Sequence, residues 1–192
     1  MGQYWQPVVF DSCGNIYTVR TIGSAKLTEH SWLRNEVCLK VCEFILNEPK
    51  LVYWVGDYCK EAAEKFRKIK NNFPVQAYKA IREEYSLMTA ELPELKNPNF
   101  TVDKGFLINH TKKEYLNFKD FIKSSIDSDG WCMHPLPLLT AMPEGNGLGG
   151  GDYYSKIGMD FIGYWSGDLI EYTLQAPDGY NQIDVTFKEI YN

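Results

Sequence analysis

The fold is decided by residues 4–22, which read Tyr4-Trp5-Gln6-Pro7-Val8-Val9-Phe10-Asp11-Ser12-Cys13-Gly14-Asn15-Ile16-Tyr17-Thr18-Val19-Arg20-Thr21-Ile22. Two runs rich in β-branched and aromatic residues, 4–10 and 16–22, flank a short polar segment. The residues of the two runs favour extended strands, whereas the Asp, Ser, Gly and Asn between them favour a turn. The stretch therefore predicts an antiparallel β-hairpin.

The rest of the chain repeats this pairing of strand-like runs. Further runs are 51–55, 106–108 with 115–118, 157–165 with 169–174, and 183–190. Because strands come in neighbouring pairs and not in alternation with helices, we predict an α+β fold. We expect one globular domain over residues 1–192, with helices packed on a mostly antiparallel sheet.

Helices are predicted where apolar residues recur at intervals of three and four. One such segment is 32–47, with Ser31 as its N-cap and Pro49 beyond its end. Similar spacing predicts helices at 60–71, 75–88 and 118–126. Residues 134–137 carry two prolines, which predicts a stiff extended segment there.

Composition excludes several classes of function. The chain is 44% hydrophobic with a net charge of −5, and its basic cluster at 60–70 is interleaved with glutamates. A broad nucleic-acid surface would need a basic stripe, so none is expected. The chain contains no run of 18 apolar residues and no visible signal peptide, and its five cysteines lack framework spacing. We therefore expect a soluble cytoplasmic protein with free thiols.

The most unusual segment is 134–152, which contains five glycines between positions 145 and 151 and is bracketed by His134 and Asp152. Glycine reaches positive φ and lets other groups come close. The formal G-x-G-x-x-G match lacks the strand before it and the helix after it that a dinucleotide site needs. Two hypotheses remain: an anion-binding loop, or a rigid structural or partner-binding loop. The candidate site residues are His134, Asn146, Gly149, Gly150, Gly151, Asp152 and Tyr153.

A second pattern is an internal echo. The sequences Trp54-Val55-Gly56-Asp57 and Trp165-Ser166-Gly167-Asp168 each follow a predicted strand. They are either two unrelated Gly-Asp turns or a duplicated ligand-binding turn. The second interpretation adds Asp57, Trp165 and Asp168 to the candidates, and it predicts that the two turns lie close together in space.

The sequence names no reaction. His134, with Asp152 or Asp168 near it, would suit a general base or a metal ligand, and Cys132 lies two residues before it. A Cys132–His134 pair on one face of an extended strand is a further hypothesis. The chain carries no zinc-binding, phosphate-loop or nucleophile-elbow signature. We therefore predict no metal and no cofactor, and the presence of catalysis stays open.

Several segments together carry a family resemblance. They are Met1-Gly2-Gln3-Tyr4, His30-Ser31-Trp32, Trp54-Val55-Gly56-Asp57-Tyr58, Leu107-Ile108-Asn109-His110-Thr111-Lys112-Lys113-Glu114-Tyr115, His134-Pro135-Leu136-Pro137-Leu138-Leu139-Thr140, Gly149-Gly150-Gly151-Asp152-Tyr153 and Trp165-Ser166-Gly167-Asp168. In these segments the chain resembles a family of uncharacterised proteins of bacteria and bacteriophages. The resemblance implies one kind of role: a small protein that blocks a bacterial immune effector by binding the effector or its signal molecule.

Two classes of function follow. The first is a protein-interaction module with a protein partner, which the 15% aromatic content suits because Tyr and Trp dominate binding hot spots. The alternative is a small-molecule or nucleotide-binding protein, or an enzyme, that uses the 134–152 loop.

Overall fold

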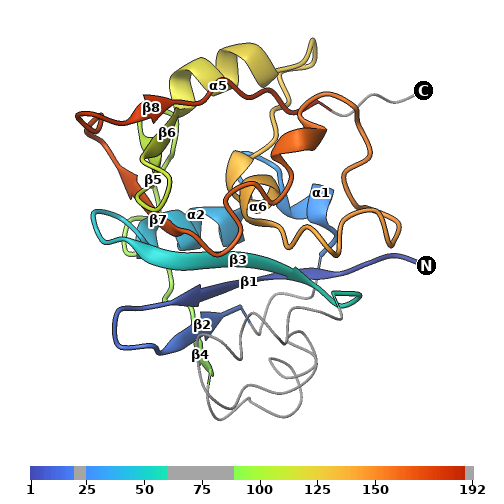
Figure 1. The fold of residues 1–192 in the computed structure, drawn as a ribbon, viewed down its shortest axis with the longest axis horizontal. Coiled ribbons are helices and arrows are strands. Elements are labelled where there is room, and N and C mark those ends of the chain that lie inside the picture. Colours follow the sequence, from blue (N-terminus) through green and yellow to red (C-terminus); the bar gives the residue numbers. More distant parts are fainter. Residues whose placement is uncertain (20–24, 60–88, 189–192) are drawn as a thin grey trace.

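The computed structural model describes residues 1–19, 25–59 and 89–188. The predicted helices at 60–71 and 75–88 lie outside the described residues, as do the basic cluster and the end of the second predicted strand. The described residues form one eight-stranded sheet in the order β4-β2-β1-β3-β7-β5-β6-β8 (Figure 1). The strands are β1 (Trp5–Phe10), β2 (Ile16–Thr18), β3 (Lys50–Gly56), β4 (Thr89–Glu91), β5 (Phe106–Asn109), β6 (Glu114–Asn117), β7 (Leu169–Thr173) and β8 (Asn181–Gln182).

The sheet is mostly antiparallel, which confirms the α+β prediction. The β1–β2 hairpin forms as predicted, with Val9 opposite Tyr17, and β1 also pairs along its whole length with β3. The second predicted hairpin, β5–β6, is confirmed with Leu107 opposite Leu116. Two pairs at the edges, β2 with β4 and β6 with β8, are parallel.

Four α-helices and one 3-10 helix lie in the described residues. They are α1 (Leu27–His30), α2 (Glu36–Phe44), α5 (Phe118–Ser125), α6 (Pro135–Thr140) and η2 (Met159–Phe161). Helix α5 confirms the prediction for 118–126. The predicted N-cap Ser31 is wrong, because Ser31 closes α1 and Asn35 caps α2. The Asn35 side chain accepts the N–H groups of Val37 and Cys38, which the first turn of α2 leaves without partners.

The prediction of an extended segment at 134–137 is wrong, because helix α6 begins at Pro135. Pro135 occupies the first helical position, where the missing N–H is not needed and the fixed φ suits a helix. The His134 ring accepts the N–H of Leu136 at 3.2 Å and so acts as the N-cap. The prolines therefore start a helix in place of an extended strand.

Two further predicted strands are wrong. Residues 157–165 form turns and η2, since Gly158 and Gly163 both have positive φ, at 79° and 72°, which breaks an extended run. Leu169–Thr173 does form a strand, but it pairs with β3 and β5 and not with 157–165. Within 183–190, the described residues 183–188 form no strand, although Val185 and Phe187 are buried.

Large aromatic side chains fill the core between the sheet and the helices. Fully buried rings are Trp5, Trp54, Trp165, Tyr153, Tyr172, Phe118 and Phe187. Helix α6 packs against β3, and Trp54 forms an isolated bridge with Ala141 just after the helix. Figure 1 shows α1, α2 and α6 gathered beside β3. In the part of the chain that the structure describes, no helix has the length and apolarity needed to cross a bilayer.

Candidate functional site

The carboxylate of Asp152 organises the glycine-rich loop. Its Oδ2 accepts the N–H groups of Gly147 and Gly149, each at 2.9 Å. Its Oδ1 accepts the indole N–H of Trp5, also at 2.9 Å, and the residue is 3% exposed. Hydrogen bonds to a charged acceptor are stronger than neutral ones. A single buried carboxylate therefore ties the loop to strand β1.

Backbone contacts fix the other side of the loop. The N–H of Gly150 donates to the carbonyl of Met1 at 3.0 Å, and its own carbonyl accepts the N–H of Gln3 at 3.1 Å. The carbonyl of Gly151 accepts the N–H of Thr28 at 3.1 Å. With its side-chain amide turned to satisfy both of its atoms, Gln3 donates to Asp152 at 2.9 Å as well. The loop is thus held against the first residues of the chain and helix α1.

Asn146 and Tyr153 clamp the two ends of the loop together. The Asn146 amide donates to the Tyr153 carbonyl at 3.0 Å and accepts the Tyr153 N–H at 2.9 Å. The Tyr153 ring is fully buried, and its hydroxyl donates to the carbonyl of Ile157 and accepts the N–H of Lys188 at 3.0 Å. The buried Tyr153 and the half-buried Asn146 therefore hold the two ends of the loop together.

The glycines differ in what they contribute. A Cβ at Gly149 would lie 2.5 Å from the Cβ of Gln3, and Gly151 has a φ of 89° with Lys26 packed against it. These two positions need glycine for close approach and for positive φ. Gly150 is exposed, and its Cβ would meet nothing closer than 3.7 Å. The anion-binding hypothesis loses support, because the N–H groups of Gly147 and Gly149 already donate to a carboxylate of the chain itself.

Two large side chains, one in the loop and one two residues after it, are exposed to solvent, and the sequence analysis identified neither. Leu148 is 56% exposed and Tyr154 is 60% exposed, while the Tyr154 hydroxyl donates to the carbonyl of Gly149 at 2.6 Å. The signal in the sequence was one bulky apolar residue between glycines, which no core pattern explains. We call the pair Leu148 and Tyr154 the loop face.

His134 is buried, and its surroundings do not suit a general base. Besides capping α6, its Nε2 lies 3.7 Å from the Sγ of Cys42, and burial lowers the pKa of the ring to about 3. The ring is therefore neutral at ordinary pH. The hypothesis of a Cys132–His134 pair is wrong, since His134 faces Cys42, and burial raises the pKa of the Cys132 thiol to about 12.

The two Gly-Asp turns lie at opposite ends of β3, so the prediction that they meet is wrong. Gly167 donates its N–H to the carbonyl of Val52 at 3.0 Å, near the start of the strand. Asp57 follows the end of the strand, where its N–H donates to the carbonyl of Tyr4 at 2.9 Å. Five residues of extended chain span roughly 16 Å. The echo therefore reflects two separate turns.

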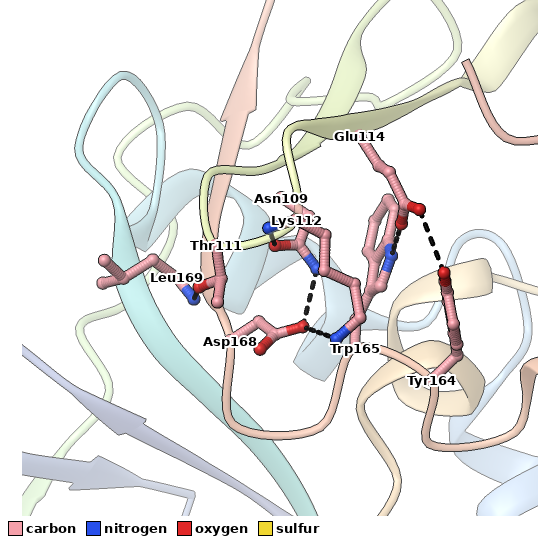
Figure 2. Close-up of polar contacts among 8 residues, drawn as sticks. All are labelled: Asn109, Thr111, Lys112, Glu114, Tyr164, Trp165, Asp168 and Leu169. Carbon is pink, nitrogen blue, oxygen red and sulfur yellow. Dashed lines mark hydrogen bonds and ion pairs between the residues drawn. The ribbon is translucent and has the colours of Figure 1, made fainter. Parts of the chain in front are cut away.

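Asp168 belongs to a polar network between that turn and the tip of the β5–β6 hairpin (Figure 2). Its Oδ2 accepts the side-chain amide of Asn109 at 2.8 Å and pairs with the Lys112 ammonium at 2.7 Å. The N–H of Leu169 donates to the hydroxyl of Thr111 at 3.0 Å. These contacts fasten the hairpin tip to the start of β7.

Trp165 takes part in the same network from the other side. Its indole N–H donates to the carboxylate of Glu114 at 3.0 Å, and the Tyr164 hydroxyl donates to the second oxygen of that carboxylate at 3.0 Å (Figure 2). The Lys112 ammonium lies 5.2 Å from the centre of the Tyr164 ring, within cation–π range. Each polar side chain drawn therefore has a partner inside the network, which fastens the hairpin tip to the turn at 164–168.

The chain was compared with protein-family models, curated proteins and solved structures. No protein-family model, curated protein or solved structure matches the chain. Among the described residues, no cluster of three or more His, Cys, Asp or Glu side chains is arranged to hold a metal ion. The interpretation of the site therefore depends on its own geometry.

Proposed function

We propose that this protein is a protein-interaction module that presents the loop face to a protein partner. The observation that carries the proposal is the exposure of Leu148 and Tyr154 on backbone that Asp152 holds in place. Ordering a mobile loop on binding costs free energy, and a loop that is already fixed avoids that cost. Covering a leucine side chain contributes about 1.5–3 kcal/mol.

The class of partner follows from charge and from the family resemblance. A protein with a net charge of −5 and a mainly apolar loop face suits a protein surface better than a nucleic acid. The resemblance to bacterial and bacteriophage proteins favours one such partner, an effector of bacterial immunity. In this proposal the protein acts in the cytoplasm of the bacterial host as an inhibitor.

The alternative role for the loop, binding of a nucleotide or another anion or catalysis on it, is the weaker proposal. It would need free N–H donors and a titratable group beside them. Gly147 and Gly149 donate to Asp152 instead, and His134 is buried against Cys42.

The test compares two matched substitutions in living cells. Bacterial strains that each carry one immune system are infected with a phage that the system restricts, with and without this protein. The wild type and Leu174→Asp, a control at a leucine that is 65% exposed outside the loop, should restore plaques in at least one strain. Leu148→Asp should not restore them.

Affinity then separates binding from indirect effects. The effector of the relieved strain is purified, and its dissociation constant is measured by calorimetry with each variant. Loss of one buried leucine predicts a rise of about tenfold or more for Leu148→Asp. Equal plaque counts and equal affinity for Leu148→Asp and the wild type, or no relief by the wild type in any strain, would contradict the proposal.

A further inference from the structure

A cavity of about 500 Å³ opens beside helix α5, away from the residues of the loop face. It lies between the turn at 32–34, α5 and the segment 130–132. A smaller cavity of about 240 Å³ shares Leu33, Arg34 and Asp103 with it. The larger volume falls within the range of pockets that hold small ligands. Neither cavity includes a residue of 145–154, so this site is independent of the proposed function.

Hydrogen bonds fix the walls of the cavity in advance. The N–H of Leu33 donates to the carbonyl of Cys132 at 3.0 Å, and the N–H of Asn35 donates to the carbonyl of Trp32 at 2.8 Å. The Asp127 carboxylate accepts the N–H of Trp131 at 2.8 Å and so closes the turn beneath Gly130. The backbone of the site is therefore already ordered, and binding a ligand costs little free energy for ordering it.

One wall is apolar and carries an exposed ring. Lys119 and Ile122 lie three residues apart on one face of α5, and Ile126, the C-cap residue of the helix, follows four residues later and lines the same cavity. Trp32 lines the same cavity and is 46% exposed. An accessible indole is a stacking platform for a planar ring, because every nucleobase has a π-face.

Three exposed charged side chains line the cavity, and no described residue pairs with any of them. Among the described residues, the side chains of Arg34 and Lys119 form no hydrogen bond or ion pair. The Asp103 carboxylate also has no hydrogen bond or ion pair there. Two unpaired cations at one cavity of an acidic protein favour an anionic group, and the planar guanidinium suits a phosphate. The lone carboxylate favours a hydroxyl or amine donor on the same ligand.

We infer that this cavity binds a mononucleotide. The base lies against Trp32, the phosphate lies between Arg34 and Lys119, and a ribose hydroxyl or exocyclic amine donates to Asp103. The apolar side chains of Ile122 and Ile126 exclude water from the second face of the base. A single nucleotide satisfies all three polar side chains, whereas an apolar compound satisfies none of them.

The experiment titrates the full chain with AMP, GMP, CMP and UMP by calorimetry and follows tryptophan fluorescence in parallel. We expect at least one of them to bind and to quench the fluorescence. The matching nucleoside, which lacks the phosphate, should bind at least tenfold more weakly. Arg34→Ala and Trp32→Ala should each weaken binding about tenfold or more. Both side chains are exposed, and circular dichroism verifies that the variants fold.

Lys123→Ala supplies the control, because it removes one positive charge, as Arg34→Ala does, but at a position on α5 that does not line the cavity. Its affinity should equal that of the wild type. The inference is overturned if no mononucleotide binds at millimolar concentration, or if Arg34→Ala binds as tightly as Lys123→Ala. Binding of benzoate, a phosphate-free aromatic anion, at least as tight as that of every mononucleotide would also overturn it.

Discussion

Removal of the Asp152 carboxylate should destabilise the protein more than any surface change in the same loop. The carboxylate accepts hydrogen bonds at 2.9 Å from Gly147, Gly149 and Trp5, and a fourth from the turned side-chain amide of Gln3, which also donates to the carbonyl of Gly145. Substitution by alanine leaves the buried donors of Gly149 and Trp5 without partners, and each such donor costs about 1–3 kcal/mol. Since the Gly147 donor can reach water, we expect Asp152→Ala to lower the free energy of unfolding by about 3–5 kcal/mol.

Urea unfolding measures this change. With a slope of about 2 kcal/mol per molar urea, the midpoint should fall by roughly 2 M. Asp178→Ala is the control, because Asp178 is exposed and its carboxylate has no hydrogen bond among the described residues. Its free energy of unfolding should stay within about 0.5 kcal/mol of the wild type, which at the same slope is a midpoint shift of about 0.25 M at most. A midpoint for Asp152→Ala as close to the wild type as that of the control would refute the role given to this carboxylate.

Two further predictions concern the same region and the core. Gly149→Ala, which brings a Cβ too close to Gln3, and Gly151→Ala, which forces alanine to a φ of 89°, should each destabilise the protein by about 1–3 kcal/mol. Gly150→Ala should be nearly neutral in the same thermal unfolding experiment. Equal effects of all three substitutions would contradict these roles. Burial lowers the pKa of His30 to about 4 and that of His134 to about 3, so the unfolded chain binds more protons from about pH 6.5 downward. The contribution of the neutral rings to the free energy of unfolding is therefore fully present above about pH 6.5 and falls as the pH drops. His134→Asn keeps a capping side chain, and it should reduce the loss of stability between pH 7 and pH 5 by about 2 kcal/mol. If the variant lost as much stability as the wild type over this range, His134 would titrate normally in the folded protein.

The parts of the fold that local pattern determines could be predicted. The β-branched and aromatic residues of 4–10 and the turn residues after them predicted the β1–β2 hairpin, and the same reasoning predicted β5–β6. The strand expected at 157–165 failed because its apolar residues surround two glycines of positive φ, and sequence alone does not reveal φ. In 183–188, apolar residues at every second position suggested a strand, and Val185 and Phe187 are indeed buried. A strand also needs a neighbouring strand to pair with, however, and the N–H of Phe187 donates to the Ser125 hydroxyl and not to a strand.

The candidate site shows the same division. The glycine spacing and the acidic residue after it identified a loop of unusual conformation. The acceptor of its N–H groups was not foreseeable, because Asp152 also binds the indole of Trp5, 147 residues earlier. Nor does sequence place Arg34 and Lys119 on one cavity, since a helix and a turn far apart in the chain supply them. These contacts depend on packing between distant segments, which local sequence propensity does not predict.

The central claim is that Asp152 holds the glycine loop rigid, so that the loop face is ready for a partner. Amide hydrogen exchange of Gly147 and Gly149, followed by NMR, tests it most directly. Both N–H groups should exchange roughly a hundredfold or more slowly than an unprotected amide, and Asp152→Ala should remove that protection. The amide of Gly179, which has no acceptor among the described residues, should exchange freely as the reference. Exchange of Gly147 and Gly149 at the rate of Gly179 in the wild-type protein would contradict the account.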